Sequence, residues 1–144
     1  MNHQKIEILL VEDNPGDVEL TRQALDDADF NNKLNVTLDG DEALDYLNKR
    51  KGFEDAKMPD IILLDLNLPR TDGRGVLKEL KASDELKHIP VIVLSSSRAE
   101  RDINDAYALN ASCYIAKPNG AMKYMEVVRT VSSFWSQTCY LPVK

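Results

Sequence analysis

The stretch LLDLNLPRTDG, residues 63–73, decides the fold, because it sets one acidic side chain, Asp65, where an apolar strand gives way to a turn. The stretch ILLVEDN, residues 8–14, repeats this design and ends in the pair Glu12-Asp13. Two carboxylates about 5 Å apart repel by roughly 3 kcal/mol at an effective dielectric near 20, so a cluster needs a counter-charge. Oxygen ligands without Cys or His nearby favour Mg²⁺ over zinc. We therefore expect Mg²⁺ where these strand ends meet; the alternative is that the acids are solvated loop residues.

Apolar strand-like runs alternate with amphipathic segments five times along the chain. This pattern is typical of an α/β fold, here a doubly wound five-stranded parallel sheet with helices on both faces. The runs at 61–64 and 91–94 are apolar on both faces, as central parallel strands are. The second strand alternates instead, which suits an edge position. The expected strands are residues 6–11, 34–38, 60–66, 91–95 and 113–116.

Apolar residues at helical spacing predict a helix after each strand. The last helix, 121–137, has an apolar surface wider than one sheet face needs. Its expected stripe is Met122, Met125, Val128 and Trp135, and Val127, Val131 and Phe134 widen it. Val131, Phe134 and Trp135 are therefore candidate contacts of a homodimer. The alternative is that Trp135 only closes the bottom of the core. Residues 48–59 are expected to form an extended loop, and the tail either is disordered or packs back on the last helix.

Length and charge limit the function. At 144 residues we expect one domain, 1–144, with a core at 6–137 and a tail at 138–144. The net charge is −6 and the basic residues are scattered, so neither DNA nor an anionic membrane is an expected partner. The start of the chain lacks a signal peptide and no run is long enough to span a bilayer, so we expect a cytoplasmic protein. Cys113 and Cys139 are expected to be reduced thiols.

The acidic strand ends lie where an open doubly wound sheet binds ligands. Such sheets bind ligands at the carboxyl ends of the strands, where the strand order reverses. If the order is 2-1-3-4-5, the reversal lies between the strands that end in Glu12-Asp13 and in Asp65. Strand four ends in Ser95 and strand five in Lys117. A hydroxyl and an ammonium thus join three carboxylates on one rim.

With these residues in this order, the chain resembles the receiver domain of two-component response regulators from about residue 6 to residue 134. The motifs are the acidic pair, an Asp followed by Pro69 and Asp72-Gly73, a hydroxyl, and Lys117-Pro118. The resemblance implies a flavodoxin-like (βα)5 fold and a phosphorelay response regulator. Asp65 would accept a phosphoryl group from a phosphohistidine of a sensor histidine kinase, with no enzymatic activity beyond gaining and losing that group.

The resemblance also implies a Mg²⁺ ligand set. Asp13 and Asp65 would bind the ion directly, Glu12 would hold a metal-bound water, and the backbone carbonyl of Asn67 would supply another ligand. Glu12 stands where an Asp is more usual in the family, which lengthens the side chain by a methylene and keeps the charge.

The remaining site residues serve catalysis and switching in the family. Lys117 would contact a phosphoryl oxygen, and the Lys117-Pro118 bond is usually cis. Ser95 would be the switch hydroxyl, whose inward turn vacates space that Tyr114 can fill. The alternative for Tyr114 is an ordinary half-buried strand aromatic. The 48–59 loop and the ending Ser133-Phe134-Trp135 look like the single-domain regulators that serve bacterial phytochrome kinases, a subgroup of homodimers.

Two other function classes compete with a working receiver. A haloacid-dehalogenase-like phosphatase also uses an Asp nucleophile with Mg²⁺, but it needs a second Asp where this chain has Asn67. Flavin binding needs a hydroxyl-rich phosphate loop after the first strand, where Glu12-Asp13 would repel phosphate. A third possibility is a pseudo-receiver, an interaction module that is never phosphorylated.

Overall fold

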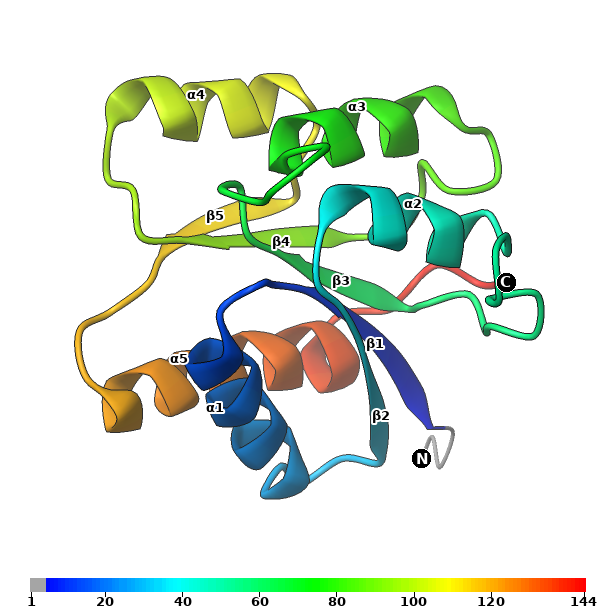
Figure 1. Ribbon diagram of the computed structural model, residues 1–144. Helices are drawn as coiled ribbons and strands as arrows, with labels where there is room; N and C mark the ends of the chain where they lie inside the picture. Colours follow the sequence, from blue (N-terminus) through cyan, green and yellow to red (C-terminus); the bar gives the residue numbers. More distant parts are fainter. Residues whose placement is uncertain (1–4) are drawn as a thin grey trace.

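The central sheet has five parallel strands in the order β2-β1-β3-β4-β5. Figure 1 shows the computed structural model, which describes residues 5–144, with a helix after each strand. The strands are β1 (Ile6–Val11), β2 (Asn32–Thr37), β3 (Ile61–Leu64), β4 (Val91–Ser95) and β5 (Cys113–Ala116). The helices are α1 (Pro15–Asp26), α2 (Gly40–Leu47), α3 (Gly73–Ala82), α4 (Glu100–Ala108) and α5 (Ala121–Ser133), which continues as a π-helical turn, η1 (Phe134–Thr138). The predicted doubly wound α/β fold and its strand order are confirmed.

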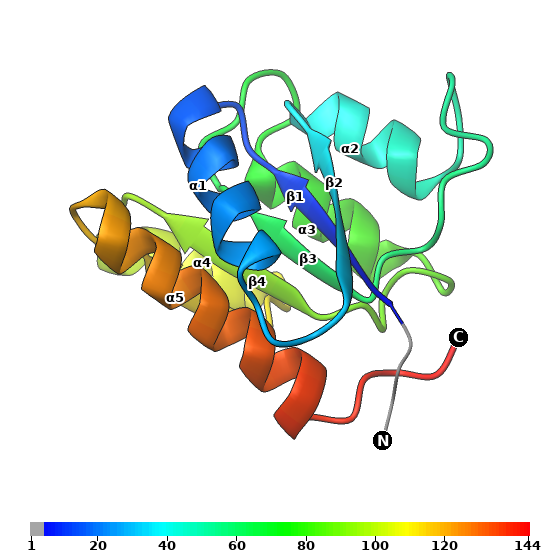
Figure 2. The same cartoon turned by 90° about the horizontal axis from the view of Figure 1, so that it is seen from below.

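Helices cover both faces of the sheet. Figures 1 and 2 show α1 and α5 on one face and α2, α3 and α4 on the other. Every residue of β1 is buried for this reason. Leu9 and Val11 belong to the core beneath α2, α3 and α4, whereas Ile8 and Leu10 belong to the core against α1 and α5. This alternation follows from the two-residue period of a strand.

Two strands, β2 and β3, differ from the prediction at both ends. β2 begins at Asn32 and ends at Thr37, one residue before Leu38, which is 53% exposed. The chain leaves the sheet there because Asp39 caps α2 and accepts a hydrogen bond from the Glu42 N–H at 2.7 Å. β3 is shorter than predicted, because its pairing with β1 ends where Val11 faces Leu64.

The buried stripe of α5 differs from the predicted one. Tyr124, Val128 and Val131 are buried, and Met122 is 76% exposed, so its assignment to the stripe is wrong. A helix turns about 100° per residue, so the six steps from Met122 to Val128 turn about 600°, which is about 120° short of two full turns. Met122 therefore points about 120° away from Val128 around the helix axis. The predicted helix to residue 137 is an α-helix to Ser133 and a π-helical turn beyond it.

The tail packs back on the domain. Leu141 contacts the core on the α1 and α5 face, and the Lys144 ammonium lies 3.1 Å from Oδ1 of Asp60, the residue before β3.

Residues 48–59 form a loop without helix or strand, as expected, and Gly52 within it has a φ of 99°. Among the helices of residues 5–144, none combines the length and the apolar composition that a membrane span requires. Residues 1–4, which belong to the start of the chain where no signal peptide is expected, lie outside the described residues.

Candidate functional site

The acidic side chains meet at the carboxyl ends of β1 and β3. The two strands are neighbours, and Val11 pairs with Leu64, so the residues that follow them lie at the same level of the rim. Glu12 and Asp65 are buried, with 1% and 8% exposure, whereas Asp13 is exposed. The three side chains each offer a carboxylate oxygen, and these atoms lie within 4.8 Å of one another. The predicted convergence of both strand ends is therefore present.

Lys117, which directly follows the edge strand β5, brings a positive charge into this cluster. Its backbone N–H donates to Ser95 O at 2.7 Å, which aligns the end of β5 with the end of β4. Its ammonium lies 2.6 Å from Glu12 Oε1 and 3.1 Å from Asp65 Oδ2, and the side chain is 9% exposed. The Lys117-Pro118 bond is trans, as are the other peptide bonds of residues 5–144. This differs from the cis bond that the resemblance implied. Trans is the form that X-Pro bonds generally prefer.

Burial and charge shift the acid–base properties of the site. Burial raises the pKa of Glu12 to about 7, and the nearby charge of Asp65 adds to this effect, whereas the hydrogen bond from Lys117 opposes it. Burial works to lower the pKa of Lys117, but hydrogen bonds to Glu12 and Asp17 raise it well above its ordinary value. The ammonium is therefore charged at neutral pH.

The donor set fits a divalent cation that prefers oxygen. Three carboxylates in one cluster, two of them buried, carry more negative charge than one ammonium neutralises. Mg²⁺ takes one or two carboxylates and completes its shell with other oxygens. The Asn67 N–H donates to Asp65 Oδ1 at 3.0 Å, so the residue expected to supply a backbone carbonyl lies directly beside Asp65.

The Asp72-Gly73 motif begins α3 against the backbone of Asp65 and Leu66. Asp72 Oδ1 accepts a hydrogen bond from the Gly75 N–H at 3.1 Å and caps the helix. The Gly73 N–H donates to Leu66 O at 2.9 Å. A Cβ on Gly73 would lie 2.7 Å from the backbone oxygen of Asp65, closer than real Cβ atoms approach. A glycine is therefore required where the helix passes under the Asp65 loop.

The expected switch residues lie on β4 and β5. Ser95 is fully buried, and its Oγ accepts a hydrogen bond from the Ser97 N–H at 3.3 Å. The Tyr114 hydroxyl donates to Ser97 O at 2.8 Å, and its ring packs against the core on the α2, α3 and α4 face. The Ser97 hydroxyl donates to Asp102 of α4, which also accepts from Arg74 of α3. Ser95 and Tyr114 are thus connected through Ser97, and the same serine is tied to α4.

One residue of the site was missed in the sequence. Asp17 Oδ2 lies 2.9 Å from the Lys117 ammonium and is its third carboxylate partner. Asp17 belongs to the first turn of α1. The helix start Asn14-Pro15 directly after Glu12-Asp13 places this turn at the rim of the site, and that proximity was the available signal.

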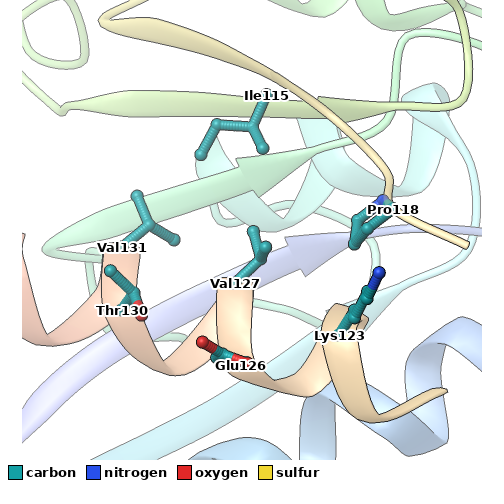
Figure 3. Close-up of a pocket in the computed structure, with 7 residues that line it drawn as sticks. All are labelled: Ile115, Pro118, Lys123, Glu126, Val127, Thr130 and Val131. Atoms are coloured by element: carbon teal, nitrogen blue, oxygen red, sulfur yellow. The ribbon is translucent and has the colours of Figure 1, made fainter. Parts of the chain in front are cut away.

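The candidate dimer residues differ in exposure. Val131 is buried with 9% exposure, Phe134 is 49% exposed, and Trp135 is half-buried and packs on the core. The Phe134 and Trp135 rings meet edge to face with centroids 6.0 Å apart. A mainly apolar groove of about 510 Å³ lies between β5 and α5. Figure 3 shows the residues that line it, which are Ile115, Pro118, Lys123, Glu126, Val127, Thr130 and Val131.

Comparison with known proteins identifies the family of this chain. The model of the response regulator receiver domain matches residues 8–129. Response regulator Rcp1 of Synechocystis sp. is 39% identical over 135 residues, which cover 94% of this chain and 92% of Rcp1.

Two solved structures are also similar. The phosphorylated cyanobacterial phytochrome response regulator RcpA has a TM-score of 0.94 and 41% identity, covering 97% of this chain and 100% of that one. The Mn²⁺-bound form of response regulator Rcp1 has a TM-score of 0.91 and 38% identity, covering 96% and 99%. The family model and these relatives span nearly the whole chain, and the chain therefore belongs to the response regulator receiver domain family.

Proposed function

We propose that Asp65 accepts a phosphoryl group from a phosphohistidine of a sensor histidine kinase. The observation that carries this proposal is the position of Asp65 beside the Lys117 ammonium, at 3.1 Å, and within the Glu12 and Asp13 cluster. Phosphoryl transfer requires in-line positioning and neutralisation of charge on the equatorial oxygens. The charged lysine beside the Asp65 carboxylate supplies part of that neutralisation. The family match does not favour the phosphatase or the pseudo-receiver.

Each polar residue has a separate role in this proposal. Asp13 and Asp65 would hold Mg²⁺ directly, Glu12 through a water, and the Asn67 carbonyl would add a ligand. Bound Mg²⁺ supplies neutralisation of the phosphoryl oxygens. Lys117 donates to a phosphoryl oxygen, and its buried position excludes water from that side. The Mn²⁺-bound structure of Rcp1 supports a divalent ion in this family.

We propose that the signal leaves through Ser95 and Tyr114. Ser95 lies at the end of β4, where its hydroxyl can turn towards new phosphoryl oxygens. Such a turn removes the acceptor for the Ser97 N–H, and Ser97 also holds the Tyr114 hydroxyl and Asp102 of α4. A change at Ser95 therefore reaches the face formed by α4, β5 and α5. A shift from mostly inactive to mostly active needs about 5 kcal/mol of differential stabilisation, which several charge-assisted hydrogen bonds can supply.

The proposed kinase is a bacterial phytochrome, and the proposed assembly is a homodimer. The phytochrome proposal is supported by the description of RcpA as a phytochrome response regulator. A histidine kinase draws on ATP, so the reaction would take place in the cytoplasm. The homodimer is supported by Phe134, which is 49% exposed and meets the Trp135 ring edge to face. It is also supported by the mainly apolar groove of Figure 3, which Val131 lines.

The decisive experiment is intact-mass measurement after incubation with acetyl phosphate, with Mg²⁺ or with a chelator. We expect a phosphoryl increment in the wild type with Mg²⁺, and none with chelator or in Asp65→Asn. A wild type that gains no increment from acetyl phosphate or from a phosphorylated phytochrome kinase would favour the pseudo-receiver. Full labelling of Asp65→Asn would refute the assignment of the acceptor.

A further inference from the structure

The Lys117 ammonium has three carboxylate partners, and one of them lies outside the acidic cluster. An ammonium has three donors, and here they reach Glu12 Oε1, Asp17 Oδ2 and Asp65 Oδ2 at 2.6, 2.9 and 3.1 Å. Glu12 and Asp65 belong with Asp13 to the cluster of carboxylates within 4.8 Å of one another. Asp17 does not belong to it. The three contacts of Lys117 are therefore not equivalent towards a cation.

A divalent cation and Lys117 would share the carboxylates of Glu12 and Asp65. The cluster offers its carboxylates to the cation, and the ammonium already occupies an oxygen of Glu12 and an oxygen of Asp65. Two positive charges on one carboxylate repel each other, so entry of the cation weakens both of these lysine contacts. Asp17 lies outside the cluster, so a cation bound by the cluster would leave this partner to the ammonium.

The local structure holds Asp17 in this position. Asn14 Oδ1 accepts a hydrogen bond from the Asp17 N–H at 3.0 Å, and Pro15 begins the helix with its constrained φ. The buried Thr21 hydroxyl donates to Asp17 O at 2.8 Å and lies 3.4 Å from the Tyr124 hydroxyl of α5. The carboxylate is 24% exposed, so water does not fully screen its contact with the lysine.

We propose that Asp17 is a positioning residue for Lys117, which draws the ammonium away from Glu12 and Asp65 and so allows a divalent cation to enter the cluster. Without the Asp17 charge, the ammonium is shared between Glu12 and Asp65 and opposes the metal more strongly. This proposal rests on the proposed function of Asp65. The competing explanation is that Asp17 acts only as an acidic residue in the first turn of a helix, where it would stabilise α1 without involving Lys117.

The test is calorimetric titration with Mg²⁺ of wild type, Asp17→Asn and Asp17→Glu. We expect Asp17→Asn to bind Mg²⁺ about three- to tenfold more weakly, the range of one partly exposed charge-assisted contact, and Asp17→Glu to recover wild-type affinity within about twofold. The matched control is Glu19→Gln, which removes one charge from the same helix at a side chain that is 60% exposed and pairs with Arg22. The control should leave the affinity unchanged.

A double-mutant cycle shows whether Asp17 acts through Lys117. In a Lys117→Met background we expect Asp17→Asn to change Mg²⁺ affinity by less than about twofold, because the ammonium that it positions is gone. An equal loss in both backgrounds would mean a through-space effect of charge and would overturn the proposal. Unchanged affinity of Asp17→Asn in the wild-type background would overturn it as well.

Phosphorylation by acetyl phosphate separates this proposal from the proposed function. In Asp17→Asn we expect a higher half-saturating Mg²⁺ concentration and a maximal rate within about twofold of wild type, since only cation entry is impaired. A labelled wild type with an unaltered Mg²⁺ requirement in Asp17→Asn overturns the role of Asp17 alone. A wild type that binds no Mg²⁺ and takes no label overturns both.

Discussion

Replacing Lys117 with methionine should destabilise the metal-free protein and make its stability depend strongly on Mg²⁺. Carboxylate oxygens within 4.8 Å of one another repel by about 3.5 kcal/mol or more per pair at an effective dielectric of 20, and each ammonium contact at 2.6 or 3.1 Å attracts by about 5 to 6 kcal/mol. Removing the ammonium thus converts net attraction into net repulsion. Protonation and relaxation reduce the loss, and breaking a buried ion pair typically costs about 3 to 5 kcal/mol.

The loss is measurable because a domain of this kind is stabilised by about 5 to 15 kcal/mol. Urea unfolding followed by the fluorescence of Trp135, the single tryptophan, gives the free energy of unfolding with EDTA or with Mg²⁺. With EDTA we expect Lys117→Met to lose about 3 kcal/mol or more. Mg²⁺ should restore much of this loss, since it binds the folded variant without competition from the ammonium.

A matched control isolates the buried charge. Lys87→Met removes an ammonium that is 44% exposed and pairs with Asp84, so it should cost less than about 1 kcal/mol and should not respond to Mg²⁺. The reasoning is refuted if Lys117→Met is as stable as wild type in EDTA. It is also refuted if Mg²⁺ stabilises wild type and variant equally, because Lys117 would then contribute only packing.

Three further predictions concern switching, pH and assembly. Ser95→Ala should accept the phosphoryl group, but its phosphorylation should not alter the environment of Tyr114. If the amide chemical shifts of α4 and β5 in Ser95→Ala still changed on phosphorylation as in wild type, the assignment of Ser95 as the switch would be contradicted. Burial raises the pKa of Glu12 from an ordinary 4.5 to about 7, so between pH 4.5 and pH 7 the folded metal-free protein keeps a proton on Glu12 that the unfolded chain has released. The contribution of this group to stability is therefore present below pH 4.5 and is lost as the pH rises through 7. Mg²⁺ needs the carboxylate, so its affinity should be higher at pH 8 than at pH 6, and Glu12→Gln should flatten this dependence in calorimetric titrations; equal wild-type affinities at both pH values would count against it. Trp135→Ala should lower dimerisation without abolishing phosphorylation, whereas Phe134→Ala should weaken the dimer with little loss of stability because this ring is 49% exposed; sedimentation profiles identical to wild type for both would exclude this surface as the interface.

Local patterns in the sequence were sufficient for the order of the elements and most of the rim. β1, β4 and β5 begin and end where their apolar runs do. Runs covered on both faces identify β1 and β4 as strands inside the sheet, whereas β5 is half-buried and forms an edge. The convergence of Glu12, Asp13 and Asp65 followed from strand order, since carboxyl ends of parallel strands share one edge. The register of an alternating edge strand is less constrained, and β2 was misplaced by two residues at its start and one at its end.

Helix faces were harder to predict. The wide apolar surface of α5 allowed several stripes, and Met122 was assigned to the buried one although it is 76% exposed. Tyr124, which is 3% exposed and approaches Thr21 of α1, was not recognised as a core residue. The face that a helix buries depends on the neighbour against which it packs, and spacing within the helix does not identify that neighbour.

The sequence by itself determined an α/β chain with acidic strand ends, a hydroxyl and a lysine on one rim, because strand periodicity and chain order are local properties. Tertiary structure decided which partners the lysine finds. Asp17 and Lys117 are 100 residues apart, and their contact exists because the first turn of α1 and the end of β5 meet above the sheet. Trp135 likewise packs on the core because of how α5 crosses the sheet. Contacts of this kind depend on the docking of whole elements, which no local pattern encodes.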